Sequence, residues 1–243
     1  MKKQLDITDK ISTTKKNTIK NFITIMIIII FTILVLTILN KFLPKQYYNA
    51  SNLNIKTIYS KVDYDEDLID DYSDFVLGAR DDIKNKPKYI SKYYENGYPP
   101  KNEGVCTDVI WRAFKKAGYS LKDMVDQDIM NHPEDYKEAT KDKNIDFRRV
   151  RNLEVFFKKY ATSLTLNLDN YEAWQPGDIV IFGNAKHIGI VSDKRTRTKI
   201  PYLIHNNGPY TQEENYLTKS RITGHYRFDA EKIDEEILIK WQK

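Results

Sequence analysis

Cysteine is almost absent from this 243-residue chain, and Cys106 is its single thiol. An internal disulfide and a cysteine-rich zinc site are therefore both excluded. The chain also contains no HExxH metal-binding motif and no glycine-rich phosphate-binding loop. It shows no internal repeat and no long low-complexity tract. These absences leave no pattern for a metal site or for another cofactor, and we expect neither.

Charge is missing from one long segment near the N-terminus. Residues 22–39 read FITIMIIIIFTILVLTIL, and as a helix this run would extend about 27 Å, close to the thickness of a bilayer core. Six lysines and two aspartates precede it in residues 1–21, which favours an N-terminus in the cytoplasm. No small-residue cleavage pattern follows the run. We therefore expect an uncleaved signal-anchor rather than a cleaved signal peptide.

The basic excess of the chain belongs to this anchor region. Residues 1–45 hold eight lysines and two aspartates, so 31 of the 39 basic and 32 of the 34 acidic residues remain beyond them. That balance gives no electrostatic footprint for nucleic acid, and we expect no nucleic-acid partner. The expected divisions are a cytoplasmic tail (1–21), a transmembrane signal-anchor (22–42), a stalk (43–62), one extracellular domain at the plasma membrane (63–232) and a C-terminal tail (233–243).

The expected domain is helical in its first half and β-rich in its second. Apolar residues recur at helical spacing in 64–84, in 105–117 and again in 146–161. The segment 120–146 is charged and irregular. After Trp174 the period changes, and short β-rich runs alternate with turn signals: GDIVIF, HIGIVSD, YLIHNN and ITGHYRF. Helices followed by an antiparallel sheet indicate the α+β class.

The lone cysteine opens the second expected helix, in GVCTDVIWRAF. A lone cysteine is commonly a small buried hydrophobe. At a helix N-terminus, however, backbone N–H groups lower the pKa of a thiol and can hold an oxyanion that forms beside the sulfur. A free cysteine outside the cytoplasm also indicates a reactive thiol or an intermolecular disulfide. Cys106 is therefore a candidate nucleophile.

A thiol nucleophile needs a base, which is usually a histidine. His187 opens one expected strand, and His205 lies in the next strand along the chain. If a hairpin joins these strands, the two imidazoles can lie side by side on one face. His225 lies in a third strand without an assigned role, and His132 falls in the irregular segment and is expected at the surface or in a turn.

The order of these motifs is similar to that of a known group of proteins. The motifs GVCTDVIWRAF, NIDFRRVRNL, WQPGDIVIF, HIGIVSD, IHNNG and ITGHYR resemble the DUF1287 family, a branch of the NlpC/P60 and CHAP cysteine peptidase clan. The resemblance spans Ala79 to Phe228. It implies a papain-like, NlpC/P60-type α+β fold with helices packed on an antiparallel sheet. Phe147 departs from the IDHRRV form associated with the family, so any histidine role at that position is lost.

The resemblance also implies a catalytic triad and a substrate. Cys106 would be the nucleophile, His187 the general base and His205 the residue that orients the base. The clan acts mostly on peptidoglycan, at its stem peptides or at the amide that joins stem to glycan. An anchored extracellular cysteine hydrolase, an amidase or endopeptidase, would be well placed for that substrate.

Four further residues are candidates for contact with substrate. A tyrosine upstream of the cysteine lines the site in NlpC/P60 enzymes, and Tyr94 and Tyr98 compete for that position with a simple packing role. Arg148 and Arg149 suit recognition of a stem-peptide carboxylate, although a solvated helix face explains them as well. Asp108 is expected to be structural, as a helix cap or as a partner of Arg112 at i+4.

Two other functions remain open at this stage. Papain-like relatives with circularly permuted chains use the same triad on ester and amide lipids, so a lipid-acting thiol enzyme or acyltransferase is an alternative. A catalytically idle wall-binding module is the other. The presence of all three expected triad residues argues against the idle module.

Overall fold

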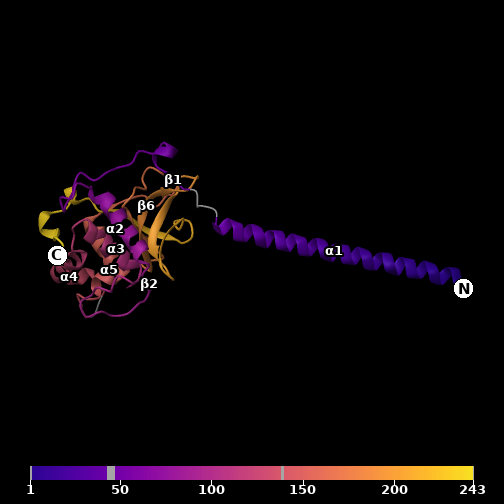
Figure 1. The fold of residues 1–243 in the computed structure, drawn as a ribbon. Coiled ribbons are helices and arrows are strands. Elements are labelled where there is room, and N and C mark those ends of the chain that lie inside the picture. Colours follow the sequence, from indigo (N-terminus) through magenta and orange to yellow (C-terminus); the bar gives the residue numbers. More distant parts are fainter. Residues whose placement is uncertain (1, 43–46, 138–139, 243) are drawn as a thin grey trace. The chain divides into compact units, whose positions relative to one another are not determined.

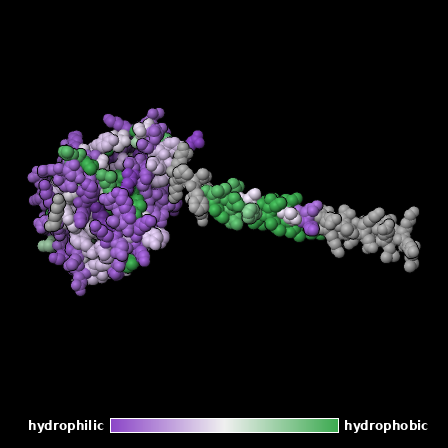
Figure 2. All heavy atoms as spheres, in the orientation of Figure 1, coloured by the Kyte–Doolittle hydropathy of each residue, from purple (hydrophilic) through white to green (hydrophobic). Residues whose placement is uncertain are grey.

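A computed structural model describes residues 2–42, 47–137 and 140–242, with side chains of the first helix described from 19 to 39. The chain forms two compact units, residues 1–46 and 47–243. The first unit contains one helix, α1 (Lys2–Phe42). Its segment Ile19–Leu39, with a mean hydropathy of 3.2, is long and apolar enough to cross a membrane. Figure 2 shows this apolar run in green. The expected N-terminal apolar helix is confirmed, and both a membrane span and a signal sequence fit it.

The helices of the second unit precede most of its strands. Its α-helices are α2 (Asp71–Asn85), α3 (Cys106–Lys116), α4 (Leu121–Asn131) and α5 (Val150–Tyr160). Its 3-10 turns are η1 (Ser51–Leu53), η2 (Pro133–Asp135), η3 (Asp146–Arg148), η4 (Ala230–Lys232) and η5 (Glu235–Ile237). Helix α4 lies in the segment 120–146 that was expected to be irregular. Its buried apolar residues recur at helical spacing, but acidic residues among them hide the pattern.

A seven-stranded antiparallel sheet is built mostly from the second half of the unit (Figure 1). Six strands lie in the order β4-β9-β5-β6-β7-β8, and β1 pairs with β6. Their bounds are β1 (Tyr48–Asn49), β4 (Thr162–Ser163), β5 (Ile179–Phe182), β6 (His187–Arg195), β7 (Pro201–Asn206), β8 (Thr211–Glu214) and β9 (Ile222–Arg227). A separate parallel pair joins β2 (Lys88–Tyr89) to β3 (Glu103–Gly104). The expected α+β class with an antiparallel sheet is confirmed.

Side chains alternate between the two faces of the central strand β6. Ile188 and Ile190 belong to the main core, which packs the sheet against the helices through residues such as Phe75 and Phe114. Val191 belongs to a smaller apolar cluster. That cluster contains Trp174, Val180, Phe182, Leu203 and Leu217. The helix that opens at Cys106 is thereby held against β6.

The segments expected as a stalk and as a C-terminal tail both contain residues that pack onto the domain. Residues 43–46 of the stalk lie outside the described residues, but Ile55 is buried. The Gln175 amide accepts a hydrogen bond from Ile58 N at 3.0 Å. At the other end, Trp241 N donates to Gly118 O at 2.7 Å. Such isolated contacts leave no periodic pattern in a polar sequence, so composition alone indicated a stalk and a tail.

Candidate active site

Cys106 is the first residue of α3, as the sequence predicted. Residue Val105 before it is extended, and its N–H donates to Asp108 Oδ2 at 2.7 Å, which caps the helix. The Cys106 side chain is 6% exposed. Backbone N–H groups of Ile188, at the start of β6, and of Thr107 point toward the sulfur. The thiol therefore lies where the mouth of α3 meets the beginning of β6.

Burial decides the protonation of this thiol. Burial raises the pKa of Cys106 to about 11, and the N–H groups of Ile188 and Thr107 oppose that rise only in part. A lowered pKa was expected from the helix N-terminus alone. The structure corrects this because desolvation outweighs the helix field. The resting side chain is a neutral thiol that needs a base.

His187 and His205 lie side by side, as the sequence predicted. His187 begins β6 and His205 lies in the neighbouring strand β7. Their rings are joined by a hydrogen bond of 2.7 Å between His187 Nε2 and His205 Nδ1. Gly189 makes room for this pair, because a Cβ there would lie 3.0 Å from His205 Cβ and 2.8 Å from the Leu203 side chain. Both rings are buried.

Both imidazoles are poised as neutral groups. Burial first, and the charge of His205 second, lower the pKa of His187 to about 3. Burial also lowers the pKa of His205 to about 4, although Glu214 opposes the shift. At neutral pH one ring must therefore donate to the other, since only one proton can lie between them. A neutral His187 has the protonation state that a general base requires.

Two tyrosines that the sequence analysis did not single out lie around the candidate site, and one of them contacts both imidazole rings. The ring of Tyr216 lies 4.2 Å from that of His205 and 5.5 Å from that of His187, centre to centre. Burial first, and a charged Cys106 among other causes, raise the pKa of both Tyr216 and Tyr89. Both phenols are thus within range of the negative charge that Cys106 would carry as a thiolate. Among the described residues no hydrogen bond joins the sulfur to a ring, so direct thiol–imidazole contact stays a prediction.

The histidine pair ends at a carboxylate that the sequence analysis also missed. Glu214 Oε1, at the end of β8, lies 3.3 Å from His205 Nε2. Glu214 is itself ion-paired with Lys219. The β7–β8 register, in which Leu203 pairs with Glu214, brings this side chain alongside His205. In the sequence, only the pair of glutamates shortly after IHNN hinted at it.

Arg148 binds the helix cap rather than standing open for substrate. Its Nε and Nη2 donate to the two oxygens of Asp108 at 2.8 and 2.9 Å, and the residue is 7% exposed. Asp108 also accepts from Trp111 Nε1 at 2.8 Å. The capping role expected for Asp108 is confirmed. The expected Asp108–Arg112 contact is replaced by an Arg112–Asp82 ion pair.

The other three candidates for substrate contact are placed differently from one another. Arg149 forms an ion pair with Asp146. The Tyr94 hydroxyl donates to Glu103 Oε2 at 2.7 Å, and the Arg148 guanidinium lies over its ring at 4.9 Å. Tyr98 instead packs in an aromatic cluster with Trp111, Phe147 and Trp241.

A cavity of about 440 Å³ adjoins the residue before the cysteine. Its lining includes Val105, Lys92, Tyr93, Arg148 and Arg149. Cys106, His187 and His205 are not among its lining residues, and its three basic side chains each have an acidic partner.

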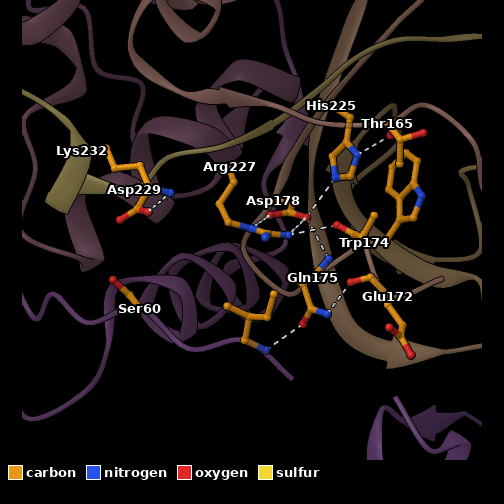
Figure 3. A network of polar contacts seen from close by, with 12 residues as sticks. Ser60, Thr165, Glu172, Trp174, Gln175, Asp178, His225, Arg227, Asp229 and Lys232 are labelled. Atoms are coloured by element: carbon orange, nitrogen blue, oxygen red, sulfur yellow. Dashed lines mark hydrogen bonds and ion pairs between the residues drawn. The ribbon is translucent and has the colours of Figure 1, made fainter. Parts of the chain in front are cut away.

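His225 belongs to a different, fully bonded network (Figure 3). Its Nε2 contacts Asp178 Oδ2 at 2.9 Å and its Nδ1 contacts Thr165 O at 2.8 Å. Arg227 donates to both oxygens of Asp178, at 2.7 and 2.8 Å. The Trp174 ring stacks on His225 at 3.8 Å. The motifs WQPGD and ITGHYR thus meet in a structural clamp between β5 and β9.

The remaining histidine is exposed, and one group of acidic side chains already has a cation beside it. His132 caps the end of α4 and its side chain is 47% exposed, as expected for a surface or turn residue. Within the described residues, one group of side chains could hold a metal ion by distance: Asp63, Asp65 and Asp67. The Lys116 ammonium already lies 2.7 Å from Asp67 Oδ2, so a cation is in place there.

Comparison with known proteins decides the family. Residues 76–228 match the family described as Domain of unknown function (DUF1287). The chain belongs to the DUF1287 family. It is 36% identical over 162 residues to the Uncharacterized protein YijF of Escherichia coli (strain K12). The aligned region covers 62% of this chain and 78% of that protein. No solved structure matches the chain. The DUF1287 match includes the cysteine, both paired histidines and the His225 clamp.

Proposed function

We propose that this DUF1287 protein is a papain-like cysteine hydrolase of NlpC/P60 type that cleaves an amide bond in peptidoglycan. One observation carries the proposal most directly: His187 opens the strand against whose backbone the Cys106 sulfur lies, and it is hydrogen-bonded to the buried His205 of the next strand. The pair has the protonation state of a base with an orienting partner. The peptidoglycan substrate rests on the resemblance to the clan.

The reaction follows the division of labour in a thiol–imidazole pair. Neutral His187 takes the thiol proton as the Cys106 sulfur attacks the substrate carbonyl. Backbone N–H groups at the mouth of α3 would hold the oxyanion that develops. The imidazolium then gives its proton to the leaving amine, and an acyl-enzyme remains. Water, deprotonated by His187, hydrolyses this thioester and restores the thiol.

The apolar helix supports a proposal for the location of the enzyme. We propose that α1 is an uncleaved membrane anchor with its N-terminus in the cytoplasm, which places the hydrolase outside the plasma membrane. The lysine excess before the apolar run supports this orientation. A hydrolase held there is within reach of the cell wall.

The test is digestion of purified peptidoglycan by the full chain in detergent, with mass spectrometry of the released fragments. We expect new amine and carboxyl ends at one type of amide bond. Cys106→Ala should release nothing while it keeps the wild-type circular dichroism spectrum, because a cysteine at the edge of the core contributes little packing.

The same assay separates the alternatives. Binding to the wall without fragments would support the idle wall-binding module and contradict the hydrolase. Release of acyl chains from added lipid, without cleavage of peptidoglycan, would support the lipid-acting enzyme instead.

A further inference from the structure

One buried nitrogen of the candidate site lacks a hydrogen bond. His205 Nε2 has no hydrogen-bond partner in the part of the chain that the structure describes. Glu214 Oε1 lies 3.3 Å from it, within ion-pair distance but outside the angles of a hydrogen bond. Buried polar atoms are normally hydrogen-bonded. A small rotation of the Glu214 side chain would complete a hydrogen bond between its carboxylate and His205 Nε2. Catalytic hydrogen bonds are often long before substrate binds.

Glu214 is suited to accept that hydrogen bond. Burial raises the pKa of Glu214, but contacts with Lys219 and His205 outweigh burial and lower it. The carboxylate is therefore ionised at neutral pH, and an ionised carboxylate only accepts hydrogen bonds. A proton on His205 Nε2 is therefore stabilised by the Glu214 carboxylate.

We propose that Glu214 is a positioning residue that sets the tautomer of His187 through His205, and this proposal rests on the proposed function. With Nε2 of His205 protonated and facing Glu214, the other nitrogen, Nδ1, must accept. His187 Nε2 must then be the donor in the 2.7 Å bond between the rings. That leaves the lone pair of His187 on Nδ1, free to take the proton of a thiol.

Without the carboxylate the opposite arrangement becomes available. His205 can then carry its proton on Nδ1 and donate it to His187 Nε2. A neutral His187 would in that case be protonated on Nδ1, and this nitrogen could not act as a base. A carboxylate two groups away from the thiol thereby decides whether His187 can act as the base.

The carboxylate also acts during the reaction. When His187 takes the thiol proton it becomes an imidazolium, and its Nε2–H still donates to His205 Nδ1. The negative charge of Glu214 at the far end of His205 stabilises that positive charge. The proton that His187 takes from the thiol therefore stays on His187 until it is transferred to the leaving amine. Lys219 shares the carboxylate and limits this effect.

The charged and titratable groups around His205 come from three parts of the chain. His187 faces it from β6, while Glu214, Tyr216 and Lys219 face it from β8 and the segment after β8. Cys106, at the mouth of α3, is within electrostatic range of Tyr216. Of these groups, Glu214 is the only acidic side chain recorded against the His205 ring in the described residues.

The first test reads the tautomers directly. Nitrogen-15 NMR of histidine-labelled full chain in detergent distinguishes protonated from unprotonated ring nitrogens, and single His→Gln variants assign the four histidines. We expect His187 to be protonated on Nε2 and His205 on Nε2 in the wild type. In Glu214→Leu a substantial fraction of both rings should shift to the Nδ1–H form. Unchanged tautomers in Glu214→Leu would overturn the proposal.

The second test uses the single thiol as a reporter. We expect Glu214→Leu to slow alkylation of Cys106 by iodoacetamide at pH 7 by about tenfold, less than the about 10²–10⁴ that a general base itself contributes. Glu214→Asp should restore part of the rate, and Glu236→Leu, at an exposed site, should leave it unchanged. A melting temperature that falls in Glu214→Leu without a change in tautomer or alkylation rate would show a merely structural role.

These measurements need no substrate, so they fail separately from the proposed function. If the wild type does not cleave peptidoglycan but the tautomers respond to Glu214→Leu, the proposed hydrolase function is wrong and the positioning role of Glu214 is supported. If the wild type cleaves peptidoglycan and the tautomers do not respond, the positioning role is wrong and the hydrolase function is supported.

Discussion

Two histidine clusters on one sheet differ in how many of their ring nitrogens have a hydrogen-bond partner. His225 has a partner on each ring nitrogen, a stacked indole and an aspartate that is shared with Arg227. The His187–His205 pair shares one bond and leaves His205 Nε2 unmatched. Both clusters are buried. Burial alone therefore does not distinguish a structural histidine from a candidate catalytic one.

The difference distinguishes a structural histidine cluster from a candidate reactive one in this fold. A fully bonded cluster loses energy when any member moves, so it holds strands in place. An incompletely bonded pair keeps a lone pair or a proton available for another group. We expect the His225 cluster to serve stability and the His187–His205 pair to serve reaction.

The largest effect that can sharpen this contrast is the loss of His187. We expect His187→Ala to lower turnover on the order of 10⁶-fold, about 8 kcal/mol, because the base activates the thiol and protonates the leaving group. His205→Ala should cost less, since water partly replaces an orienting group. The Cys106→Ala/His187→Ala double variant should be little worse than either single variant. The measure is fragment release from peptidoglycan by the folded full chain. Additive losses would contradict a shared mechanism.

The next effect is on stability and concerns the other cluster. We expect Asp178→Ala to lower the free energy of unfolding by about 3–5 kcal/mol, because it leaves the buried His225 and Arg227 without their shared partner. Urea unfolding of the full chain in detergent measures it, with Asp169→Ala at an exposed site as the control. The alkylation rate of Cys106 below the transition should stay at the wild-type value. A change in that rate with little loss of stability would break the comparison.

The smallest effect tests the protonation of the resting thiol. With the pKa of Cys106 raised to about 11 by burial, little thiolate exists at pH 7. We expect iodoacetamide to alkylate the folded chain about a hundredfold more slowly than the urea-unfolded chain, whose thiol has its ordinary pKa near 8.5. The folded rate should keep rising with pH beyond 9. A plateau that begins below pH 6 would instead indicate a preformed thiolate–imidazolium pair.

Much of the candidate site could be predicted from local sequence. The helix that begins at Cys106 and the strands that carry His187 and His205 follow from periodicity and turn signals, and the pairing of adjacent strands brings the two imidazoles together. The role of His225 could not be predicted, because it depends on Asp178 and Trp174, which are about fifty residues away in the sequence.

Other features depend on packing that no short segment encodes. Glu214 reaches His205 only through the β7–β8 register. The pKa of Cys106 rises because distant segments bury it, while local sequence indicated only the opposing helix field. Arg148 looked like a surface residue until its pairing with Asp108, forty positions earlier in the chain, became visible.

The two-residue pairing of β1 with β6 has a mechanical consequence. Tyr48 and Asn49 pair with Arg195 and Lys194, at the end of β6 opposite His187 and about 26 Å from it along the strand. Tension transmitted through the chain from residues before Tyr47 would enter the sheet at that end. Arg195 is buried there and donates to Tyr171 O and Lys199 O, which hold this end of β6 in place. Because only two residues pair, β1 would separate from β6 before the rest of the sheet is disturbed. The His187 end of β6 would then keep its structure under load.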